Sequence, residues 1–287
     1  MINYNPKDWI PFIFKLHKSD TFRKLIPAML AMAIYAFGVA YLEIYYLQLS
    51  ENHHLKNINI VHSLLGFVIS MLLVFRTNTA YDRWWEGRKL WGSLTNTSRN
   101  LALKISAILH DEHDRNYFRT LIPLYASVLA KHLTNEEVGQ TLYDDIPLEI
   151  NQHKHKPNQV ARALHQKVND LLKAKKITDF EYLSLQTELQ AFTDIMGGCE
   201  RIKNTPIPYS YSVFIKKFIF LYVITLPIGL VFTLGFYAIP VVVFMFYILA
   251  SLELIAEEIE EPFGGDENDL PIQKMAANIK IHVQEVL

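Results

Sequence analysis

Four long stretches without a charged residue constrain this chain more than any other feature. A helix needs about 20 apolar residues to cross the hydrocarbon core of a bilayer. The uncharged stretches cover residues 25–42, 57–75, 218–237 and 238–252. Gly235 and Pro240 predict a turn between the last two, because proline starts a helix better than it continues one. The alternative, that these are buried helices of a soluble protein, fits four such runs in two closely spaced pairs poorly. We therefore predict four transmembrane helices.

The basic residues around these stretches predict an orientation. Cytoplasmic loops carry an excess of lysine and arginine. Such residues precede the first stretch, follow the second and precede the third: Lys15, Lys18, Arg23, Lys24, Arg76, Arg83, Arg88, Lys89, Lys203, Lys216 and Lys217. The connection between the first two stretches has only Lys56, and the turn at 235–240 has no basic residue. Both termini and the long middle segment are therefore expected in the cytoplasm.

Several ionisable residues lie at or within the spans, where unpaired charge is costly. His62 lies inside the second stretch, so we expect it to face water in a vestibule or to bond to a neighbouring helix. Five glutamates crowd the inner end of the fourth stretch: Glu253, Glu257, Glu258, Glu260 and Glu261. Some of them should pair with Arg76, Arg83 or Arg88.

The segment between the two pairs of spans is charged and has the apolar spacing of amphipathic helices. Thr178 followed by Glu181 has the pattern of a capping box, and another helix should start near Asn158, just after Pro157. No segment shows the alternating apolar and polar pattern of a β-strand, so we predict that the fold class is all-α. The predicted regions are 1–99 (N-terminal segment and spans 1 and 2), 100–209 (cytosolic helical region), 210–261 (spans 3 and 4) and 262–287 (cytosolic C-terminal segment with an acidic loop).

Composition excludes several function classes. The 28 basic and 29 acidic residues nearly balance, which argues against nucleic-acid binding. A single cysteine, Cys199, excludes an intramolecular disulfide and a thiolate metal cluster. His110 and His113, like the pair His153 and His155, are expected to be solvated at helix ends and in loops rather than to hold a metal. No phosphate loop or nucleophile motif is present, so we do not expect an enzyme.

The second span does not stop at the membrane. After Phe75 the sequence RTNTAYDRWWEGRKLWGSLTNTSRNLALKISAIL has no proline, which predicts one helix that continues into the cytosolic region. Three passages resemble the bestrophin family: LLVFRTNTAYDRWWEGRKLWG, GGCERIKNTPIPYSYS and ELIAEEIEEPFGGDENDLPI. The resemblance covers the whole chain in order and is closest to the shorter bacterial members. It implies a homopentamer in the inner (plasma) membrane, with the second helices lining an axial pore.

The resemblance also implies a narrow hydrophobic neck at Phe67, Met71 and Phe75. Their spacing of four residues puts them on one helix face, and five copies would form stacked apolar rings that impede ions by dewetting. The alternative is ordinary packing. Nearly every residue from Leu64 to Phe75 is apolar, so periodicity alone cannot identify the face that lines a pore.

A second constriction of the family falls at or next to Glu181. Five carboxylates around a pore exit would attract cations and repel chloride, and the bacterial members that this chain resembles conduct monovalent cations. The alternative for Glu181 is a capping residue on a solvated surface. We therefore expect a cation preference, sodium included, and keep a chloride-conducting channel of the same architecture as the alternative.

The acidic loop after Pro262 corresponds in the resemblance to the calcium clasp of animal bestrophins. Asp266 and Asp269 occupy its acidic positions, and Ca²⁺ prefers several oxygen ligands from such a loop. The acidic run is short here and bacterial relatives do not need calcium, so a plain acidic turn is the favoured interpretation. No cofactor should be required.

The resulting hypothesis is a pentameric channel that passively conducts small monovalent ions. Its expected partners are further copies of this chain, the lipid bilayer and the permeant ions, without nucleic acid. Two rivals come from other classes. A secondary transporter would show saturable coupled flux and internal repeats, whereas a membrane-anchored scaffold would not conduct.

Overall fold

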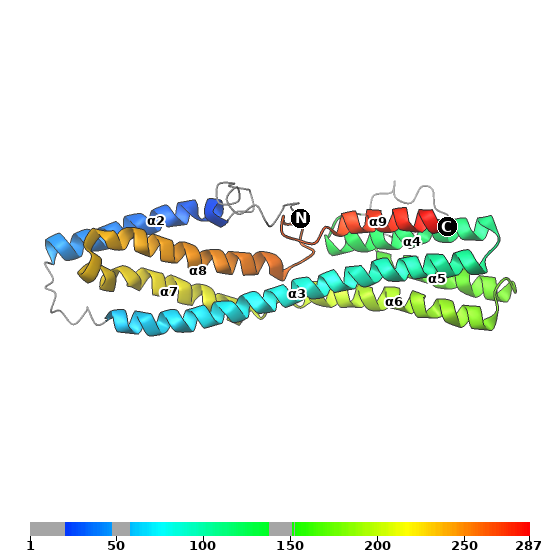
Figure 1. The fold of residues 1–287 in the computed structure, drawn as a ribbon, viewed down its shortest axis with the longest axis horizontal. Helices are drawn as coiled ribbons and strands as arrows, with labels where there is room; N and C mark the ends of the chain where they lie inside the picture. Colours follow the sequence, from blue (N-terminus) through cyan, green and yellow to red (C-terminus); the bar gives the residue numbers. More distant parts are fainter. Residues whose placement is uncertain (1–20, 48–57, 138–150, 152) are drawn as a thin grey trace. The chain divides into compact units, whose positions relative to one another are not determined.

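The computed structural model describes residues 21–47, 58–137, 151 and 153–287. Lys15, Lys18 and Lys56, which were used to predict the orientation, lie outside these residues. Every regular element in the described residues is a helix, which confirms the all-α prediction (Figure 1). The elements are α2 (Thr21–Tyr41), the π-helix η1 (Leu42–Tyr46), α3 (Ile58–Ile108), α4 (Glu112–Leu133), α5 (Lys156–Lys173), α6 (Asp179–Asn204), α7 (Tyr209–Leu234), the 3₁₀ turn η4 (Gly235–Tyr237), α8 (Ala238–Glu260) and α9 (Ile272–Val286).

The chain forms two compact units. Residues 2–82 and 207–260 make one, here called the apolar unit, and residues 83–206 and 261–287 belong to the other, here called the bundle unit. α3 is a single helix of 51 residues that contributes to both. This confirms that the second span continues as one helix far beyond the roughly 20 residues that a bilayer requires.

The apolar unit contains three helical segments that are long and apolar enough to cross a membrane: Thr21–Tyr46, Ile58–Ile108 and Tyr209–Glu260. In the most apolar window of each, only 17%, 17% and 28% of the residues are buried, so these helices are apolar on their outward faces as well. Such helices need lipid or other subunits around them.

The third segment contains two helices, α7 and α8, joined by the short turn η4. Gly235 ends α7 with a φ of 55°, a left-handed conformation that favours glycine. Pro240 lies in the first turn of α8, where its missing N–H leaves no helical hydrogen bond unmade. The predicted turn near these two residues is confirmed. Each helix is long enough to span a bilayer, with 26 and 23 residues.

One stripe of α3 packs within the apolar unit. Its residues follow one another at alternating spacings of three and four and lie close to α7 or in the shared core: Asn59, His62, Gly66, Ile69 and Leu73. The His62 imidazole Nε2 lies 2.9 Å from the Thr225 hydroxyl, and the Asn59 amide donates to the Gly229 carbonyl at 3.1 Å. Of the two sequence expectations for His62, the bond to a neighbouring helix is therefore confirmed. Glycine suits position 66, because a Cβ atom there would lie only 3.0 Å from the Tyr222 hydroxyl oxygen.

Arg76 continues this stripe and carries the main buried charge of the apolar unit. Its side chain is 1% exposed and pairs with two glutamates of α8. The guanidinium Nη2 lies 2.7 Å from Glu260 and Nε lies 3.5 Å from Glu253, whose side chain is 5% exposed. Glu260 also accepts the backbone N–H of Ile207 at 2.7 Å. The expected pairing of an arginine with the acidic end of the fourth span is thus confirmed for Arg76.

The bundle unit has a conventional apolar core. Its largest fully buried side chains include Trp91, Phe118, Tyr125 and Phe192, and the Tyr125 hydroxyl donates to the Phe192 carbonyl at 2.7 Å. These residues come from α3, α4 and α6, whereas α9 lies alongside α4 (Figure 1). The bundle unit therefore folds around its own core.

The first residues of α3 in the bundle unit hold two other segments. Arg83 donates to the carbonyls of Ile202 and Thr205, both at 2.6 Å, and so satisfies carbonyls at the C-terminal end of α6. The Trp84 indole donates to the Asn268 carbonyl at 3.1 Å. Phe263 and Leu270 lie close to Gly87 and pack the segment that follows α8 against α3. The Arg-Trp-Trp passage thus organises the start of the bundle.

The buried ion pair yields a stability prediction. Replacing Arg76 with alanine leaves Glu253 and Glu260 without their cation, which should destabilise the protein by about 3–5 kcal/mol. The matched control is Lys216→Ala, because Lys216 and its partner Glu257 are about half exposed and such a pair contributes about 1 kcal/mol or less. Unfolding of the detergent-purified protein measures both. Equal losses in the two variants would contradict the importance of the buried pair.

Candidate ion pathway and neighbouring sites

Phe67, Met71 and Phe75 form an outward face of α3. Their side chains are 67%, 45% and 56% exposed within the described chain. At about 100° per residue, Met71 lies almost opposite the packed stripe that contains Ile69 and Leu73, with the two phenylalanines about 40° to either side. The three side chains therefore point away from the core of their own subunit, which packs against the opposite face of α3. An apolar surface in this position can line a shared pore, contact another subunit or face lipid.

Glu181 lies in the first turn of α6 and closes a capping box. Its carboxylate accepts the backbone N–H of Thr178 at 2.7 Å and the Thr178 hydroxyl at 2.8 Å, and the Thr178 hydroxyl accepts the Glu181 N–H at 3.3 Å. The capping box predicted from the sequence is confirmed. The bond from the Thr178 backbone N–H lowers the pKa of Glu181, with the hydroxyl bond acting in the same direction. Glu181 therefore keeps its negative charge at neutral pH.

The neighbours of Glu181 are unusually apolar for a surface. Phe180 is 86% exposed and Leu183 is 62% exposed. Sequence reasoning considered the charge of Glu181 and passed over Phe180. The sequence did offer a signal for this apolar surface, namely a phenylalanine immediately before a helix-capping acid. A helix start on a solvated surface does not require an aromatic side chain.

Asp269 is buried within the acidic loop rather than displayed by it. The residue is 3% exposed, and its Oδ2 atom accepts the backbone N–H groups of Gly265 at 2.6 Å and Asp266 at 2.5 Å. The other oxygen, Oδ1, is buried without a hydrogen-bond partner among the described residues. The carboxylate thus stabilises its own loop.

His155 does not lie free in a loop, contrary to the sequence expectation. It is the N-cap of α5, so this helix begins at Lys156, near Asn158 as predicted but before Pro157 rather than after it. The imidazole Nε2 of His155 contacts the Glu200 carboxylate at 2.5 Å, and His132 reaches the same oxygen at 2.8 Å. Burial lowers the pKa of His132, although the bond to Glu200 opposes this. Sequence reasoning missed the group because its members lie on three separate segments.

The family model described as Bacterial/Fungal Bestrophin protein matches residues 1–285. This chain belongs to the bacterial and fungal bestrophin family. The family resemblance read from the three sequence passages is confirmed.

Two relatives of this bestrophin carry the same descriptive name. A voltage-dependent anion channel-forming protein of Nostoc sp. is 32% identical over 289 residues, covering 98% of this chain and 92% of the relative. The voltage-dependent anion channel-forming protein YneE of Escherichia coli (strain K12) is 29% identical over 290 residues, covering 100% and 94%. A crystal structure of a bacterial bestrophin homologue from Klebsiella pneumoniae with one substitution has a TM-score of 0.84 at 28% identity, covering 92% of this chain and 98% of that one. The helical fold is therefore the bestrophin fold.

The buried Asp269 gives this bestrophin a pH-dependent stability. Burial raises the pKa of Asp269 to about 6, against the opposing effect of the Asp266 and Gly265 N–H bonds. Because this folded value lies above the ordinary value of 3.8, the folded chain holds the proton more tightly than the unfolded chain. Ionisation therefore costs stability as the pH rises through about 4 to 6, and the protein recovers that stability when the pH falls.

We expect this cost to disappear in Asp269→Asn, whose amide oxygen can still accept the two loop N–H bonds. The thermal midpoint of the variant should equal or exceed that of the native chain at pH about 7.5. The difference should shrink by pH about 5, when Asp269 is protonated. A difference that stays constant between the two pH values would show that Asp269 does not titrate in this range.

Proposed function

We propose that this bestrophin is an ion channel in which identical subunits surround a shared water path. Membership of the family and the channel-forming names of its relatives support conduction. The observation that carries the proposal is the outward apolar face of α3, opposite the stripe that packs within the subunit. We further propose five subunits, four membrane crossings in each, and an inner-membrane location with both termini in the cytoplasm.

The proposed neck is built from Phe67, Met71 and Phe75. Rings of these side chains would surround a narrow passage without hydrogen-bond partners for water or ions, so ions would cross only when the passage is wetted. Three polar residues on the packed stripe of the same helix, Asn59, His62 and Arg76, have their partners on α7 or α8. The Ser70 hydroxyl donates to the Gly66 carbonyl within α3. The neck would thus be apolar while the packed stripe of the same helix is polar in places.

Widening the neck should raise conductance. Met71→Ala and Phe75→Ala remove bulk from the proposed rings, so single-channel currents in planar bilayers should increase severalfold, because the dewetting barrier falls with the radius of an apolar constriction. Val61→Ala is the matched control. Val61 is 51% exposed on the same helix but lies about 80° around it from Met71. Unchanged currents in the two neck variants would remove these residues from the pore.

Two observations bear on the charge of the permeant ion, and they favour opposite signs. The names of the relatives favour anions. The charged carboxylate of Glu181 favours cations if α6 begins at a pore exit, since a ring of carboxylates attracts cations and repels anions. The capping box gives Glu181 a structural role that also accounts for its presence. Conduction of small monovalent ions is the common proposal, with anions and cations as its two forms.

A charge-only substitution separates these forms. Glu181→Gln removes the charge while glutamine can still close the capping box. If Glu181 sets the exit, reversal potentials in asymmetric salt should move toward the anion potential in this variant, and Asp179→Asn at the same helix start should move them less. Phe180→Ala is the companion variant. If it raises conductance while Glu181→Gln leaves reversal potentials unchanged, the exit is apolar, and the reversal potential of the native channel identifies the permeant ion.

We also propose that conduction needs no bound cofactor and that the chain is not an enzyme. Asp269 is committed to its own loop, so currents should be the same in excess calcium and in a calcium chelator. A current that depends on calcium and loses this dependence in Asp266→Ala would contradict the proposal. The mass of the detergent-solubilised complex tests the ring, since a monomer cannot enclose an axial path.

A further inference from the structure

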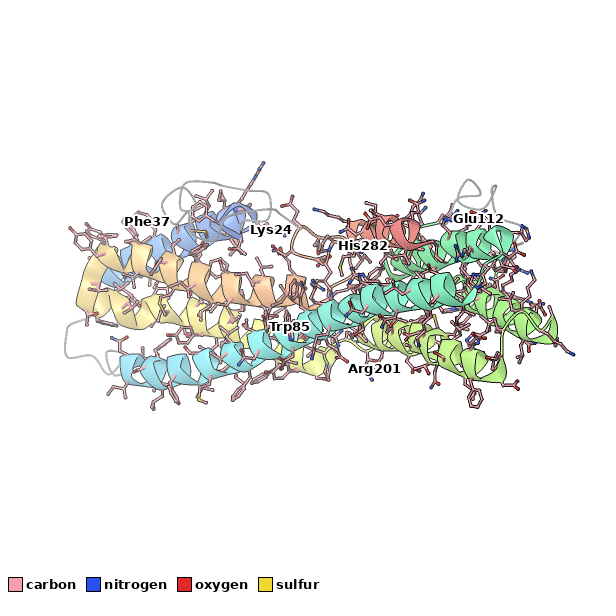
Figure 2. All side chains as sticks on the ribbon, turned by 45° about the vertical axis from the view of Figure 1, so that its right-hand side comes forward. Lys24, Phe37, Trp85, Glu112, Arg201 and His282 are labelled. Carbon is pink, nitrogen blue, oxygen red and sulfur yellow. The ribbon has the colours of Figure 1, made fainter. Side chains whose placement is uncertain are left out.

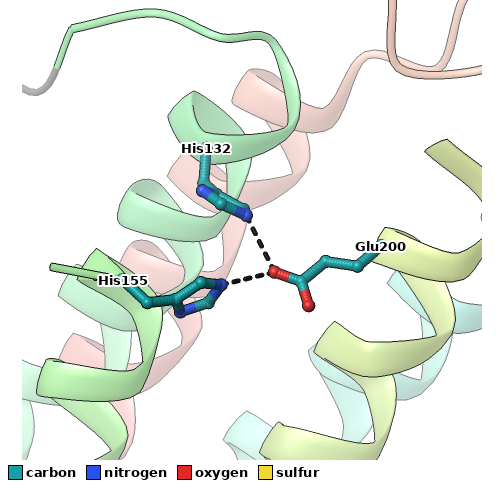
Figure 3. A group of neighbouring side chains, drawn as sticks. All are labelled: His132, His155 and Glu200. Carbon is teal, nitrogen blue, oxygen red and sulfur yellow. Dashed lines mark hydrogen bonds and ion pairs between the residues drawn. The ribbon is translucent and has the colours of Figure 1, made fainter. Parts of the chain in front are cut away.

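Two histidines and a glutamate converge at one point of the bundle unit (Figure 3). His132 lies in the last turn of α4, His155 is the N-cap of α5, and Glu200 lies near the end of α6. The Nε2 atoms of both rings contact the same Glu200 oxygen, at 2.8 Å and 2.5 Å. One ligand atom from each residue lies within 4.8 Å of the other two. Three chain segments thus direct metal-ligating atoms at a common centre.

The composition of this group selects a class of ion. Two imidazoles and one carboxylate are a characteristic ligand set for Zn²⁺, with a fourth position left for water. Imidazole nitrogens suit zinc and its neighbours in the first transition row, whereas calcium and magnesium prefer oxygen ligands. We propose that His132, His155 and Glu200 bind a divalent transition-metal ion, zinc in particular.

Only small movements separate the present arrangement from a metal site. Zinc bonds of about 2.0–2.2 Å in a tetrahedron place neighbouring ligand atoms roughly 3.3–3.5 Å apart. The two nitrogen-to-oxygen distances are now 2.8 Å and 2.5 Å, so each ring withdraws from Glu200 by less than about 1 Å. The side chains are about one quarter to one third exposed, which leaves an ion a path from solvent.

Metal binding also fixes the position of the remaining ring protons. Each imidazole that binds through Nε2 carries its proton on Nδ1. For His155 this replaces the bond in which Nδ1 accepts the Asn158 N–H, a long contact of 3.3 Å. A hydrogen bond of that length is weak, and the coordinate bond compensates for its loss.

The electrostatic surroundings are mixed, since the N-terminal end of α5 presents a partial positive charge at His155. The C-terminal end of α4 presents its partial negative charge near His132, and Glu200 supplies a full one. Lys203 opposes them, since its ammonium group donates to the His132 carbonyl at 3.0 Å and to the Asn135 amide oxygen at 2.6 Å.

An ion at this point would join the end of α4 and the start of α5 to α6. These two helix ends are the two ends of the connection from Thr134 to His155. Zinc would therefore hold both ends of that connection against α6. This role concerns the bundle unit and does not depend on whether the apolar unit conducts.

Zinc titration of the full-length, detergent-purified protein tests the proposal. After treatment with a chelator, isothermal titration with Zn²⁺ should give one ion per subunit, and Co²⁺ at the same site should give the visible absorption of a four-coordinate ion. His132→Ala and Glu200→Gln should each weaken zinc binding by more than about tenfold, the loss that even second-shell changes can cause. His153→Ala, an exposed histidine two residues before His155, should bind zinc as the native chain does.

The outcomes divide cleanly. Glu200→Gln keeps an oxygen that can accept from both rings, so an unchanged thermal midpoint without zinc shows that the variant is folded. Loss of zinc binding in that folded variant supports the site. No zinc binding by the native protein, equal binding by the native chain and both ligand variants, or loss caused by His153→Ala would each overturn the proposal. Channel currents are not part of this test, so its failure leaves the proposed conduction untouched.

Discussion

The packing of one stripe of α3 against its own subunit is the constraint on which the rest of the structure depends. Asn59, His62 and Arg76 all lie on that stripe and find their partners on α7 or α8. These three polar side chains are thereby placed on the side where protein can satisfy them. The opposite side is left free to be wholly apolar. That division of one helix makes an apolar neck compatible with a stable subunit.

Side chains with two roles recur in this molecule. Glu181 closes a capping box and carries the charge that would influence permeant ions. Glu260 balances Arg76 and accepts the Ile207 N–H, which joins the end of α8 to the start of α7. Substitutions at such positions remove both roles at once. Interpretable experiments therefore need replacements that keep one role while removing the other, as glutamine does at position 181.

Local features of the fold were predictable from the sequence, and features that join distant segments were not. The continuity of α3, the turn at Gly235 and the capping box of Thr178 depend on neighbouring residues, and all three are confirmed. The packed face of α3 was not predictable, because apolar residues surround the helix in that region. The contacts of Glu200 with His132 and His155 join residues that are 68 and 45 positions apart. Only folding brings them together.

The unbroken course of α3 has a mechanical consequence. Phe75 and Arg83 are eight residues apart, roughly 12 Å along one continuous helix, and Arg83 is held by the carbonyls at the end of α6. A helix without a proline or a break resists twisting. A rotation of α3 at Arg83 would therefore be transmitted along the helix and would also rotate Phe75.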